Sequence, residues 1–362
     1  MRILQVSSAR AFGGGERHLA DLARGLQQRG HEVLAALRED SPLRERLSFL
    51  PGQNVYALPL RNSLDLGSAL KLARIARQRE VDIIHAHVAR DYVPASFAAR
   101  RAPAARLVIT RHVLFPLSRA HRLLFSNVSR VIAVSEAVAR ALRSQKIFDE
   151  EKIRVVENSV DLARFDRARA DDDADMRFRV GIVGELSEVK GQLEFVRAAR
   201  LVADEFGNGV EFVIAGEDNS RGGQYRARVE GLIDELKLNE SVRLLGRVED
   251  VSGVVAGLDL LVSASRSEAF GMAMAEALVC GVPVVATATE GARSLIEDGV
   301  NGLLVPVGDV RAMAAAVSSL FADGERHRAL GDNARRSARE RFSPERMLAA
   351  TERVYEEALS QP

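Results

Sequence analysis

The chain of 362 residues has a single cysteine, Cys280, and no run of about 18 apolar residues. One cysteine excludes an internal disulfide framework, and its position in an apolar segment favours packing over reactivity. A membrane-spanning helix would need the longer apolar run. The first residues, MRILQVSSARAFGG, hold too few apolar side chains for a signal peptide. We therefore expect a cytoplasmic protein, either soluble or peripheral on the inner face of the cytoplasmic membrane.

Two signatures of cofactor or metal chemistry are also missing. The glycines near the N-terminus do not form GxGxxG, and no carboxylate ends the second expected strand, where Leu37-Arg38-Glu39-Asp40 comes nearest. A dinucleotide site is therefore disfavoured. No DxD stands where a metal-bridged diphosphate would require it, because the run Asp171-Asp172-Asp173 falls in a charged, aperiodic segment. We expect no metal ion and no resident cofactor.

Charge is balanced overall but not along the chain. The whole chain has 51 Lys and Arg and 50 Asp and Glu. Residues 1–165 hold 27 of the basic residues and 16 of the acidic ones, whereas the remainder holds 24 basic and 34 acidic residues. Residues 90–130 hold eight arginines and one acid, Asp91, among apolar side chains. Such a surface attracts anionic lipid head groups or an acidic acceptor. Alternatively, arginine is simply frequent and the two halves balance each other across a cleft; both interpretations remain open.

The length suits two domains, and the apolar pattern agrees with this. Short apolar runs alternate with segments of helical periodicity, which indicates parallel α/β sheets covered on both faces. The alternation stops in the charged segment DRARADDDADMRF and then restarts. Strands are expected at 2–8, 31–37, 81–87, 105–111, 129–135 and 152–158, and again at 178–184, 209–216, 241–246, 258–265, 282–287 and 301–306.

These patterns predict two Rossmann-like, doubly wound domains in tandem. The first covers residues 1–165, a linker covers 166–177, and the second domain covers 178–342. Residues 343–362 are expected to form a helix that packs toward the first domain. Ligands of such sheets bind beyond the carboxyl ends of the strands, so we expect a site in the cleft between the domains.

Each expected domain opens with a strand, a glycine-bearing loop and a helix. In the first, Gly14 and Gly15 follow the strand, and their backbone can approach an anion or a sugar closely, unless the glycines only permit the turn. In the second, Lys190 precedes a helix that begins near Gly191. An ammonium beside a helix N-terminus suits a diphosphate, although a solvated surface lysine has the same pattern.

The segment SEAFGMAMAEALVCGVP places Glu268 and Glu276 around a second helix start at Phe270 and Gly271. A helix beginning there would set the carboxylates on different sides of an anion site, some 9 Å apart along the axis at about 1.5 Å per residue. Carboxylates accept hydrogen bonds from paired sugar hydroxyls. The simpler alternatives are a helix-cap neighbour for Glu268 and a solvent-facing position for Glu276.

Several separated motifs make the chain resemble the retaining GT-B glycosyltransferases of the large fourth sequence family. Glu268 and Glu276 fit the E-x7-E motif, followed as in the family by CGVPVVAT. Residues 13–16 resemble its GG-x-E loop and residues 158–165 its N-x-V-D-x-x-x-F segment. Residues 298–305 resemble its D-G-x-N-G-x-L-V turn. The resemblance covers nearly the whole chain and implies sugar transfer from a nucleotide diphosphate donor.

The resemblance also implies roles for individual residues. Lys190 would neutralise the diphosphate, Glu268 would contact the transferred sugar, and Glu276 would hold the ribose hydroxyls. The histidine of VITRHVLFP would face the sugar at the reaction centre, whereas His85 and His87 are weaker candidates that favour a structural role. The implied catalytic residues are His112, Lys190 and Glu268. The implied donor-binding residues are Gly14, Gly15, Glu185, Lys190, Glu217, Arg247, Val248, Phe270, Gly271, Met272 and Glu276.

One position departs from the family pattern G-R-L-x-x-x-K-G. Glu185 stands where the family has an arginine that clamps the diphosphate. A carboxylate about 4 Å from a phosphate charge would be repelled by roughly 4 kcal/mol at an effective dielectric of about 20. Glu185 must therefore point away, contact a sugar hydroxyl, or be offset by another cation, for which the candidates are Arg17, Arg221, Arg266 and Arg293.

We therefore expect a retaining, metal-independent transfer from a UDP-sugar, with GDP- and ADP-sugars open. The acceptor would be a glycan or glycolipid of cell-envelope or lipopolysaccharide assembly. The basic first domain would contact an anionic membrane surface, and no nucleic acid is expected as a partner. Two alternatives share this fold: a nucleotide-sugar epimerase or phosphorylase, and a non-catalytic nucleotide-sugar-binding protein.

Overall fold

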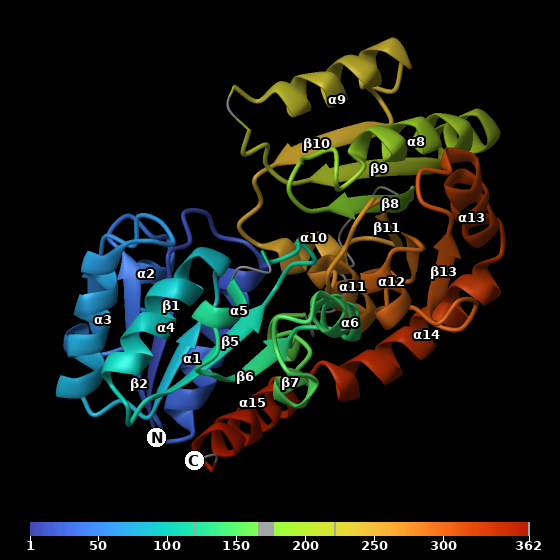
Figure 1. Ribbon diagram of the computed structural model, residues 1–362. Helices are drawn as coiled ribbons and strands as arrows, with labels where there is room; N and C mark the ends of the chain where they lie inside the picture. Colours follow the sequence, from blue (N-terminus) through green and yellow to red (C-terminus); the bar gives the residue numbers. More distant parts are fainter. Residues whose placement is uncertain (119–120, 166–176, 221, 361–362) are drawn as a thin grey trace. The chain divides into compact units, whose positions relative to one another are not determined.

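A computed structural model describes residues 1–118, 121–165, 177–220 and 222–360 (Figure 1). The chain divides into two compact units, Met1–Ser159 with Pro344–Pro362, and Val160–Ser343. Residues 166–176, most of the expected linker, lie outside the described residues. In the part that is described, no helix is both long and apolar enough to cross a membrane.

The first unit is built on a seven-stranded sheet whose paired strands are all parallel. The central strand β1 pairs with β2 on one side and β4 on the other, so that Ile3 lies between Val33 and Ile83. The sequence pattern anticipated every strand except the short edge strand β3. The strands in sheet order are β3 (Val55–Leu58), β2 (Glu32–Arg38), β1 (Arg2–Ser7), β4 (Ile83–Ala86), β5 (Arg106–Arg111), β6 (Val128–Ala133) and β7 (Ile153–Val155).

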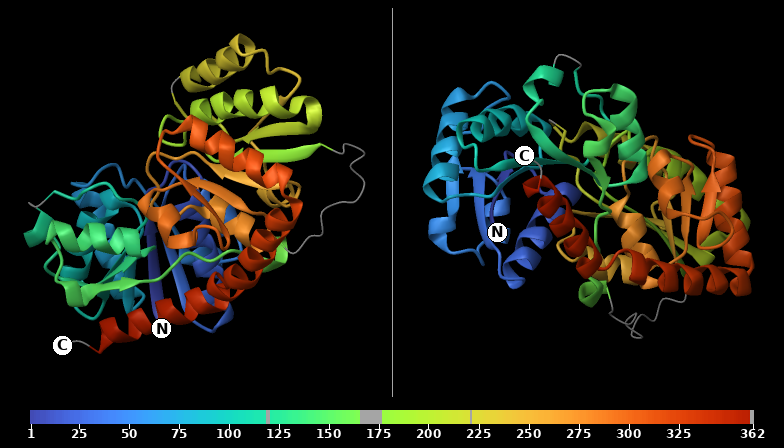
Figure 2. Two further views of the ribbon diagram at one scale, coloured as in Figure 1. Left: turned by 90° about the vertical axis from the view of Figure 1, so that its right-hand side faces the viewer. Right: turned by 60° about the horizontal axis from the view of Figure 1, so that its bottom comes forward.

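Helices cover this sheet, and one of them comes from the end of the chain. Figure 2 shows α15 beside α1, and its residues also contact β5 and β6. Tyr355 of α15 is completely buried, and Leu348 packs so closely on Gly25 that a Cβ there would lie 2.3 Å from the leucine. The helices are α1 (Gly14–Gln28), α2 (Leu43–Arg46), α3 (Leu66–Gln78), α4 (Tyr92–Arg101), α5 (His121–Leu124), α6 (Glu136–Gln145) and α15 (Pro344–Leu359).

The second unit has a six-stranded parallel sheet. Every strand was anticipated, and α8 and α13 pack against each other beside it. The strands in sheet order are β10 (Val242–Gly246), β9 (Val210–Ala215), β8 (Phe178–Val183), β11 (Leu260–Ser263), β12 (Val284–Thr287) and β13 (Gly302–Val305). The helices are α7 (Leu162–Phe165), α8 (Gln192–Phe206), α9 (Gln224–Glu235), α10 (Val251–Ala256), α11 (Met272–Cys280), α12 (Glu290–Leu295), α13 (Val310–Ala322) and α14 (Gly324–Arg341).

The start of the second unit differs from the sequence-based boundary at residue 165. Val160 donates a backbone hydrogen bond to the carbonyl of Phe342 at 2.9 Å, and α7 packs on α10 and α11. Phe165 is buried, and its carbonyl lies 3.6 Å from the Cys280 sulfur. The segment from Val160 therefore belongs to the second unit because its apolar side chains are covered there.

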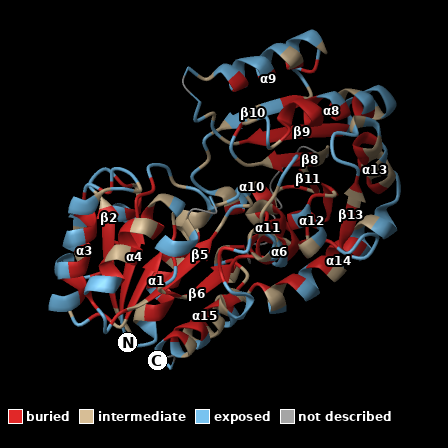
Figure 3. Cartoon of the chain, in the orientation of Figure 1, coloured by how far each residue is buried: buried red, intermediate tan, exposed pale blue. Residues whose placement is uncertain are grey.

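The strands of both sheets are largely buried, as their near-continuous apolar sequences require (Figure 3). Several helices begin at a residue whose side chain accepts a backbone N–H, such as Ser135, Thr289 and Asp309. Helices α8 and α11 instead begin after glycines in the left-handed region, Gly191 and Gly271. Together the two sheets confirm the predicted α/β class with two doubly wound, Rossmann-like domains.

Candidate functional site

In the second unit, the predicted donor residues lie at one edge of the sheet. They follow β8, β9, β10 and β11, whose carboxyl ends share an edge because the strands are parallel. Backbone hydrogen bonds join these loops: Gly184 donates to Ala215, and Gly216 donates to Gly246, each at 2.9 Å. The fold therefore brings together four loops that are far apart in the sequence.

Two of these loops approach so closely that only glycine fits. A Cβ on Gly216 would lie 1.8 Å from the carbonyl oxygen of Gly184, and one on Gly191 would lie 2.2 Å from that of Ala264. Both glycines also have positive φ, 153° and 75°. The close approach places the start of α8 directly against the end of β11.

Lys190 and Glu268 form an ion pair at this edge. The Lys190 ammonium donates to Glu268 Oε2 at 2.6 Å, and Ser265 Oγ lies 3.4 Å from the same oxygen. The lysine stem packs over Gly184, where a Cβ would be 3.8 Å from Lys190 Cε. An ammonium has three donors, so Lys190 can keep this pair and also donate to a phosphate oxygen.

Helix α11 carries the second glutamate. Glu276 is 2% exposed, so it is not the solvent-facing residue that the simpler alternative required. Phe270 is buried with its ring 5.7 Å from that of Phe342, which holds the turn before the helix. At Gly271, φ is 98°, and the first N–H groups of the helix, beginning with Met272, have no acceptor within the helix.

The predicted donor-binding residues that follow β9 and β10 are more open. Arg247 and Glu217 are exposed, and their side chains lie 3.9 Å apart, while Val248 next to them is partly buried. The Glu185 side chain is also exposed and accepts a hydrogen bond from Asn219 Nδ2 at 3.2 Å.

The candidate cations for offsetting Glu185 that the structure describes in the second unit have other hydrogen-bond partners. Arg266 pairs with Glu194 at 2.5 Å, and Arg293 donates to the carbonyl of Ala288 at 3.2 Å. Arg17 belongs to the first unit, and Arg221 lies outside the described residues. Within the described part of the second unit, the Glu185 carboxylate is therefore stabilised by solvent and Asn219.

In the first unit, the predicted residues meet beyond β1, β4 and β5. Glu16 closes the glycine loop by accepting from the backbone N–H of Gly13 at 2.9 Å, and Gly14 begins α1. A Cβ on Gly15 would lie 3.4 Å from the His112 ring, so this ring packs on the loop backbone. β1 and β4 are adjacent although β2 and β3 lie on the other side of β1, which makes this the switch point of the sheet.

His112 belongs to a group of buried histidines. His18, from α1, and His87, after β4, have ring centroids 5.2 and 5.8 Å from that of His112. Burial lowers the pKa of His18 to about 4. Burial, followed by the neighbouring histidines, lowers the pKa values of His87 and His112 well below the usual value. All three imidazoles are therefore neutral at pH 7.

His85 is different because both of its ring nitrogens have protein partners. They lie 2.7 Å from Tyr355 Oη and 2.6 Å from Thr110 Oγ1. Burial lowers the pKa of His85 to about 3. The contact with Tyr355 ties β4 to α15, which is a structural role.

Sequence reasoning did not single out His18. It lies in the first turns of α1, five residues after Gly13, and its only signal is that it follows the glycine loop. Asp91 was noted only as an isolated acid. It is 1% exposed, accepts from the backbone N–H of Ser8 at 2.7 Å, and has its pKa raised by burial to about 6.

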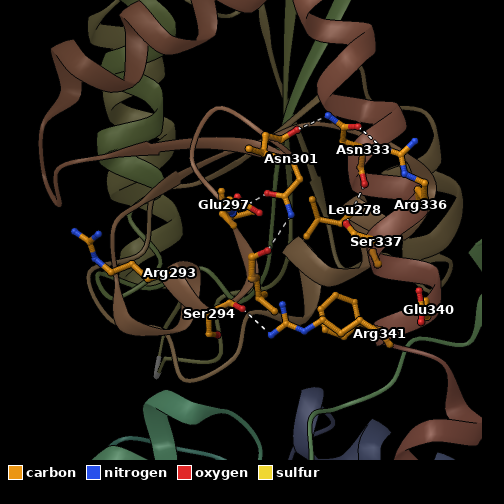
Figure 4. Close-up of a pocket in the computed structure, with 15 residues that line it drawn as sticks. Leu278, Arg293, Ser294, Glu297, Asn301, Asn333, Arg336, Ser337, Glu340 and Arg341 are labelled. Carbon is orange, nitrogen blue, oxygen red and sulfur yellow. Dashed lines mark hydrogen bonds between the residues drawn. The ribbon is translucent and has the colours of Figure 1, made fainter.

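A cavity of about 660 Å³ also lies in the second unit, but no predicted site residue lines it. Figure 4 shows it between the turn after α12 and helix α14. There Asn301 braces the turn, accepting from the backbone N–H of Glu297 at 2.8 Å and donating to the carbonyl of Leu295 at 3.2 Å. This part of the family-like motif around Asn301 is therefore structural.

Two family models match adjoining parts of the chain. "Glycosyltransferase Family 4" matches residues 12–164, and "Glycosyl transferases group 1" matches residues 165–337. The chain belongs to the group 1 glycosyltransferases. This confirms the family and the enzyme class that the sequence motifs predicted.

Relatives of this glycosyltransferase cover nearly its full length. N-acetyl-alpha-D-glucosaminyl L-malate synthase of Bacillus anthracis is 25% identical, over 94% of this chain and 92% of that protein. The lipopolysaccharide core biosynthesis glycosyltransferase LpsE of Rhizobium meliloti is 28% identical, over 93% and 94%. Among solved structures, Anabaena Alr3699/HepE in complex with UDP and glucose has a TM-score of 0.87 and 25% identity, over 98% of this chain and 99% of that one.

Proposed function

We propose that the second unit binds a nucleoside diphosphate sugar and that the enzyme transfers the sugar with retention of configuration, without a metal on the diphosphate. The observation that carries this proposal is the Lys190–Glu268 pair of 2.6 Å between the starts of α8 and α11. Both helices begin at glycine, so no side chain caps their first N–H groups. A cation and two open helix N-termini form a site for a diphosphate.

The same groups explain how the transfer would be accelerated. As the glycosidic bond breaks, negative charge grows on the departing diphosphate. Lys190 and the N–H groups from Gly271 onward would stabilise that charge more in the transition state than in the ground state. Glu268 would hold the transferred sugar. Glu276, buried farther along α11, would accept hydrogen bonds from the ribose.

In the first unit, we assign the glycine loop and His112 to the sugar and the acceptor. Gly14 and Gly15 provide backbone that a hydroxyl can approach, and His112 packs directly on this loop. A neutral imidazole can orient a sugar hydroxyl. Retention would follow from front-face attack, in which the departing phosphate accepts the proton of the acceptor hydroxyl.

UDP-sugars are the donors that we expect. Support comes from Anabaena Alr3699/HepE, whose structures contain UDP, UDP-glucose, or UDP and glucose. The acceptor that we expect is a glycan or a glycolipid of envelope or lipopolysaccharide assembly. Support comes from the name of the Rhizobium relative, which assigns it to the lipopolysaccharide core.

We also propose that the first unit contacts an anionic membrane surface. Phe115 and Leu123 are 73% and 83% exposed, and Arg122, next to Leu123 in the chain, is exposed as well. Apolar side chains next to arginine suit the boundary between head groups and acyl chains.

The donor site can be tested by thermal unfolding in the presence of UDP-, GDP- and ADP-sugars. A ligand at about 100 times its Kd stabilises by about 2.7 kcal/mol, which raises Tm by about 5 to 10 °C for a unit of this size. We expect this rise with a UDP-sugar. If no nucleotide sugar raises Tm, the donor site is wrong. Release of nucleotide with a rearranged sugar and no acceptor would instead identify an epimerase.

Glu276→Gln tests where the ribose lies. The exchange removes a charged acceptor without changing the side-chain shape, so affinity for the nucleoside diphosphate should fall about 10- to 100-fold. The matched control is Glu194→Gln, because Glu194 is also a buried helix carboxylate of the second unit, 8% exposed. Equal losses in both variants would show a general effect on folding and contradict the assignment.

A further inference from the structure

Three histidines from separate elements converge in the first unit. His18 comes from α1, His87 follows β4, and His112 follows β5. One ring nitrogen from each lies within 4.8 Å of the other two. This is the only group of three or more metal-ligating side chains that meets at such distances among residues 1–118, 121–165, 177–220 and 222–360.

Four ring nitrogens of this cluster lack a hydrogen-bond partner in the part of the chain that the structure describes. His18 Nδ1, His87 Nδ1 and both ring nitrogens of His112 are buried and accept or donate no hydrogen bond. His18 and His87 are each only 5% exposed. Buried polar atoms without partners are rare in folded proteins, because each costs about 1–3 kcal/mol. Four in one cluster therefore point to a ligand.

Gln5 sets the hydrogen position on one of these rings. His87 Nε2 lies 2.7 Å from Gln5 Oε1. A carboxamide oxygen only accepts, so Nε2 carries the hydrogen and Nδ1 keeps a bare lone pair. A histidine that donates through one nitrogen and offers the other is the arrangement found in metal sites.

We propose that His18, His87 and His112 form a binding site for a transition-metal dication, with Zn²⁺ as the reference ion. Neutral imidazoles suit Zn²⁺, Cu²⁺ and Ni²⁺, whereas Mg²⁺ and Ca²⁺ prefer oxygen ligands. A tetrahedral Zn²⁺ with bonds of about 2.1 Å would hold the nitrogens about 3.4 Å apart. The nitrogens lie within 4.8 Å of one another, and small side-chain rotations would bring them to this separation. The fourth coordination position would stay open to water or an anion.

The metal site goes beyond the proposed sugar transfer and affects it through one shared residue. A bound Zn²⁺ would occupy a His112 nitrogen and remove it from the sugar. Zn²⁺ should therefore inhibit transfer, and a chelator should restore it. Binding without inhibition would contradict the role of His112 in transfer and leave the metal site standing.

The full chain is first treated with a chelator to remove bound metal. Separate samples are then titrated with Zn²⁺ and with Mg²⁺ in a calorimeter. We expect one Zn²⁺ per chain and no heat with Mg²⁺. Co²⁺ should add visible absorption bands of a four-coordinate ion. A flat Zn²⁺ titration, or equal binding of Mg²⁺, would overturn the proposal.

Variants locate the ion. His18→Gln, His87→Gln and His112→Gln should each weaken Zn²⁺ binding by about 100-fold or more, and Gln5→Leu by about 10-fold as the loss of a positioning residue. The controls His31→Gln and His327→Gln should bind as the parent does. Circular dichroism checks folding, and His112→Gln stays informative because its ring has no hydrogen bond to lose. Equal losses in the controls would place the ion elsewhere.

Discussion

At the scale of single residues, the proposed donor site depends on where a few charges lie. Lys190 is one-third exposed and holds Glu268, which is 13% exposed, at 2.6 Å. An isolated surface pair of this kind contributes about 0–1 kcal/mol to stability. The pair therefore matters more for what it places at the sheet edge, a cation and an acceptor side by side, than for holding the fold.

Replacing Lys190 separates its contribution to catalysis from its contribution to stability. Lys190→Met should lower kcat by about 100- to 1,000-fold, because a positioned cation on the leaving group is lost, while the unfolding free energy changes by less than about 1 kcal/mol. Steady-state kinetics and urea unfolding measure the two quantities.

The matched control for Lys190 is Arg228→Met. Arg228 pairs with Glu188 at 2.6 Å in the same unit but lies outside the predicted donor residues. It should leave kcat unchanged. A Lys190→Met enzyme with the parental kcat would remove the lysine from the mechanism.

At the scale of elements, the starts of α8 and α11 distinguish the site from the rest of the unit. Asp, Ser and Thr caps elsewhere satisfy helix N–H groups with side chains. Helix α9 also begins after a glycine, Gly223, but Asp218 accepts from the N–H groups of its second and third residues, Tyr225 and Arg226, each at 2.9 Å. Side chains thus accept from N–H groups at the starts of α9, α10, α12, α13 and α14, whereas the glycine caps of α8 and α11 make no such hydrogen bond.

Gly191→Ala tests how tightly α8 is placed. Gly191 and Gly223 are both helix N-caps in the left-handed region, with φ 75° and 63°. A Cβ on Gly191 would meet the Ala264 carbonyl, whereas one on Gly223 would meet nothing within 4 Å. Both changes cost about 1–2 kcal/mol for the backbone conformation, so any further loss in Gly191→Ala reports the contact.

Urea unfolding and donor affinity measure the result. We expect Gly191→Ala to be less stable than Gly223→Ala and to bind the nucleoside diphosphate more weakly, since the start of α8 must move. Equal stability of the two variants would show that the end of β11 can move away from the added Cβ without a loss of unfolding free energy.

At the scale of the whole molecule, the first unit buries several ionisable groups in its core. Burial lowers the pKa of His18 to about 4 and that of His85 to about 3, and those of His87 and His112 fall as well. Burial raises the pKa of Asp91 to about 6, which acts in the opposite direction. In the folded first unit, burial therefore disfavours protonation of four histidines and favours protonation of one aspartate.

The stability of the first unit should therefore fall as the pH drops from 7 to 5. Below pH 6.5 the unfolded chain protonates histidines whose pKa is lowered in the fold, so each one removes about 1.4 kcal/mol per pH unit. Asp91, whose pKa is raised in the fold, has the opposite effect and adds a similar amount of stability as the pH falls. Urea unfolding at several pH values measures the slope, which His18→Gln should reduce and His327→Gln in the second unit should not.

A stability of the first unit that is constant or rises toward pH 5 would contradict this prediction. It would mean that the core admits water to the imidazoles when they are protonated.

The proposed membrane contact can also be tested at this scale. Cosedimentation with anionic phosphatidylglycerol vesicles should be weakened at least about 10-fold by Leu123→Glu, because a side chain that enters the interface contributes about 1.5–3 kcal/mol. High salt should weaken it as well. Leu64→Glu is the control, since Leu64 is 78% exposed in the same unit but precedes α3. If only Leu64→Glu weakened binding to the vesicles, the membrane contact would lie at the start of α3.

Local sequence patterns were enough to predict the alternation of strands and helices, the two sheets and the family. These follow from local patterns: buried parallel strands are apolar runs, and motifs such as the one around Glu268 and Glu276 are contiguous. The edge strand β3 was not predicted, because it is only four residues long and has little periodicity.

Which side chains meet could be learned only from the folded structure. Lys190 and Glu268 are 78 residues apart and form a pair because β8 and β11 are neighbours in the sheet. His18, His87 and His112 have no metal-ligand spacing in the sequence and meet because β1, β4 and β5 end at one edge. Such contacts depend on strand order, which local sequence does not encode.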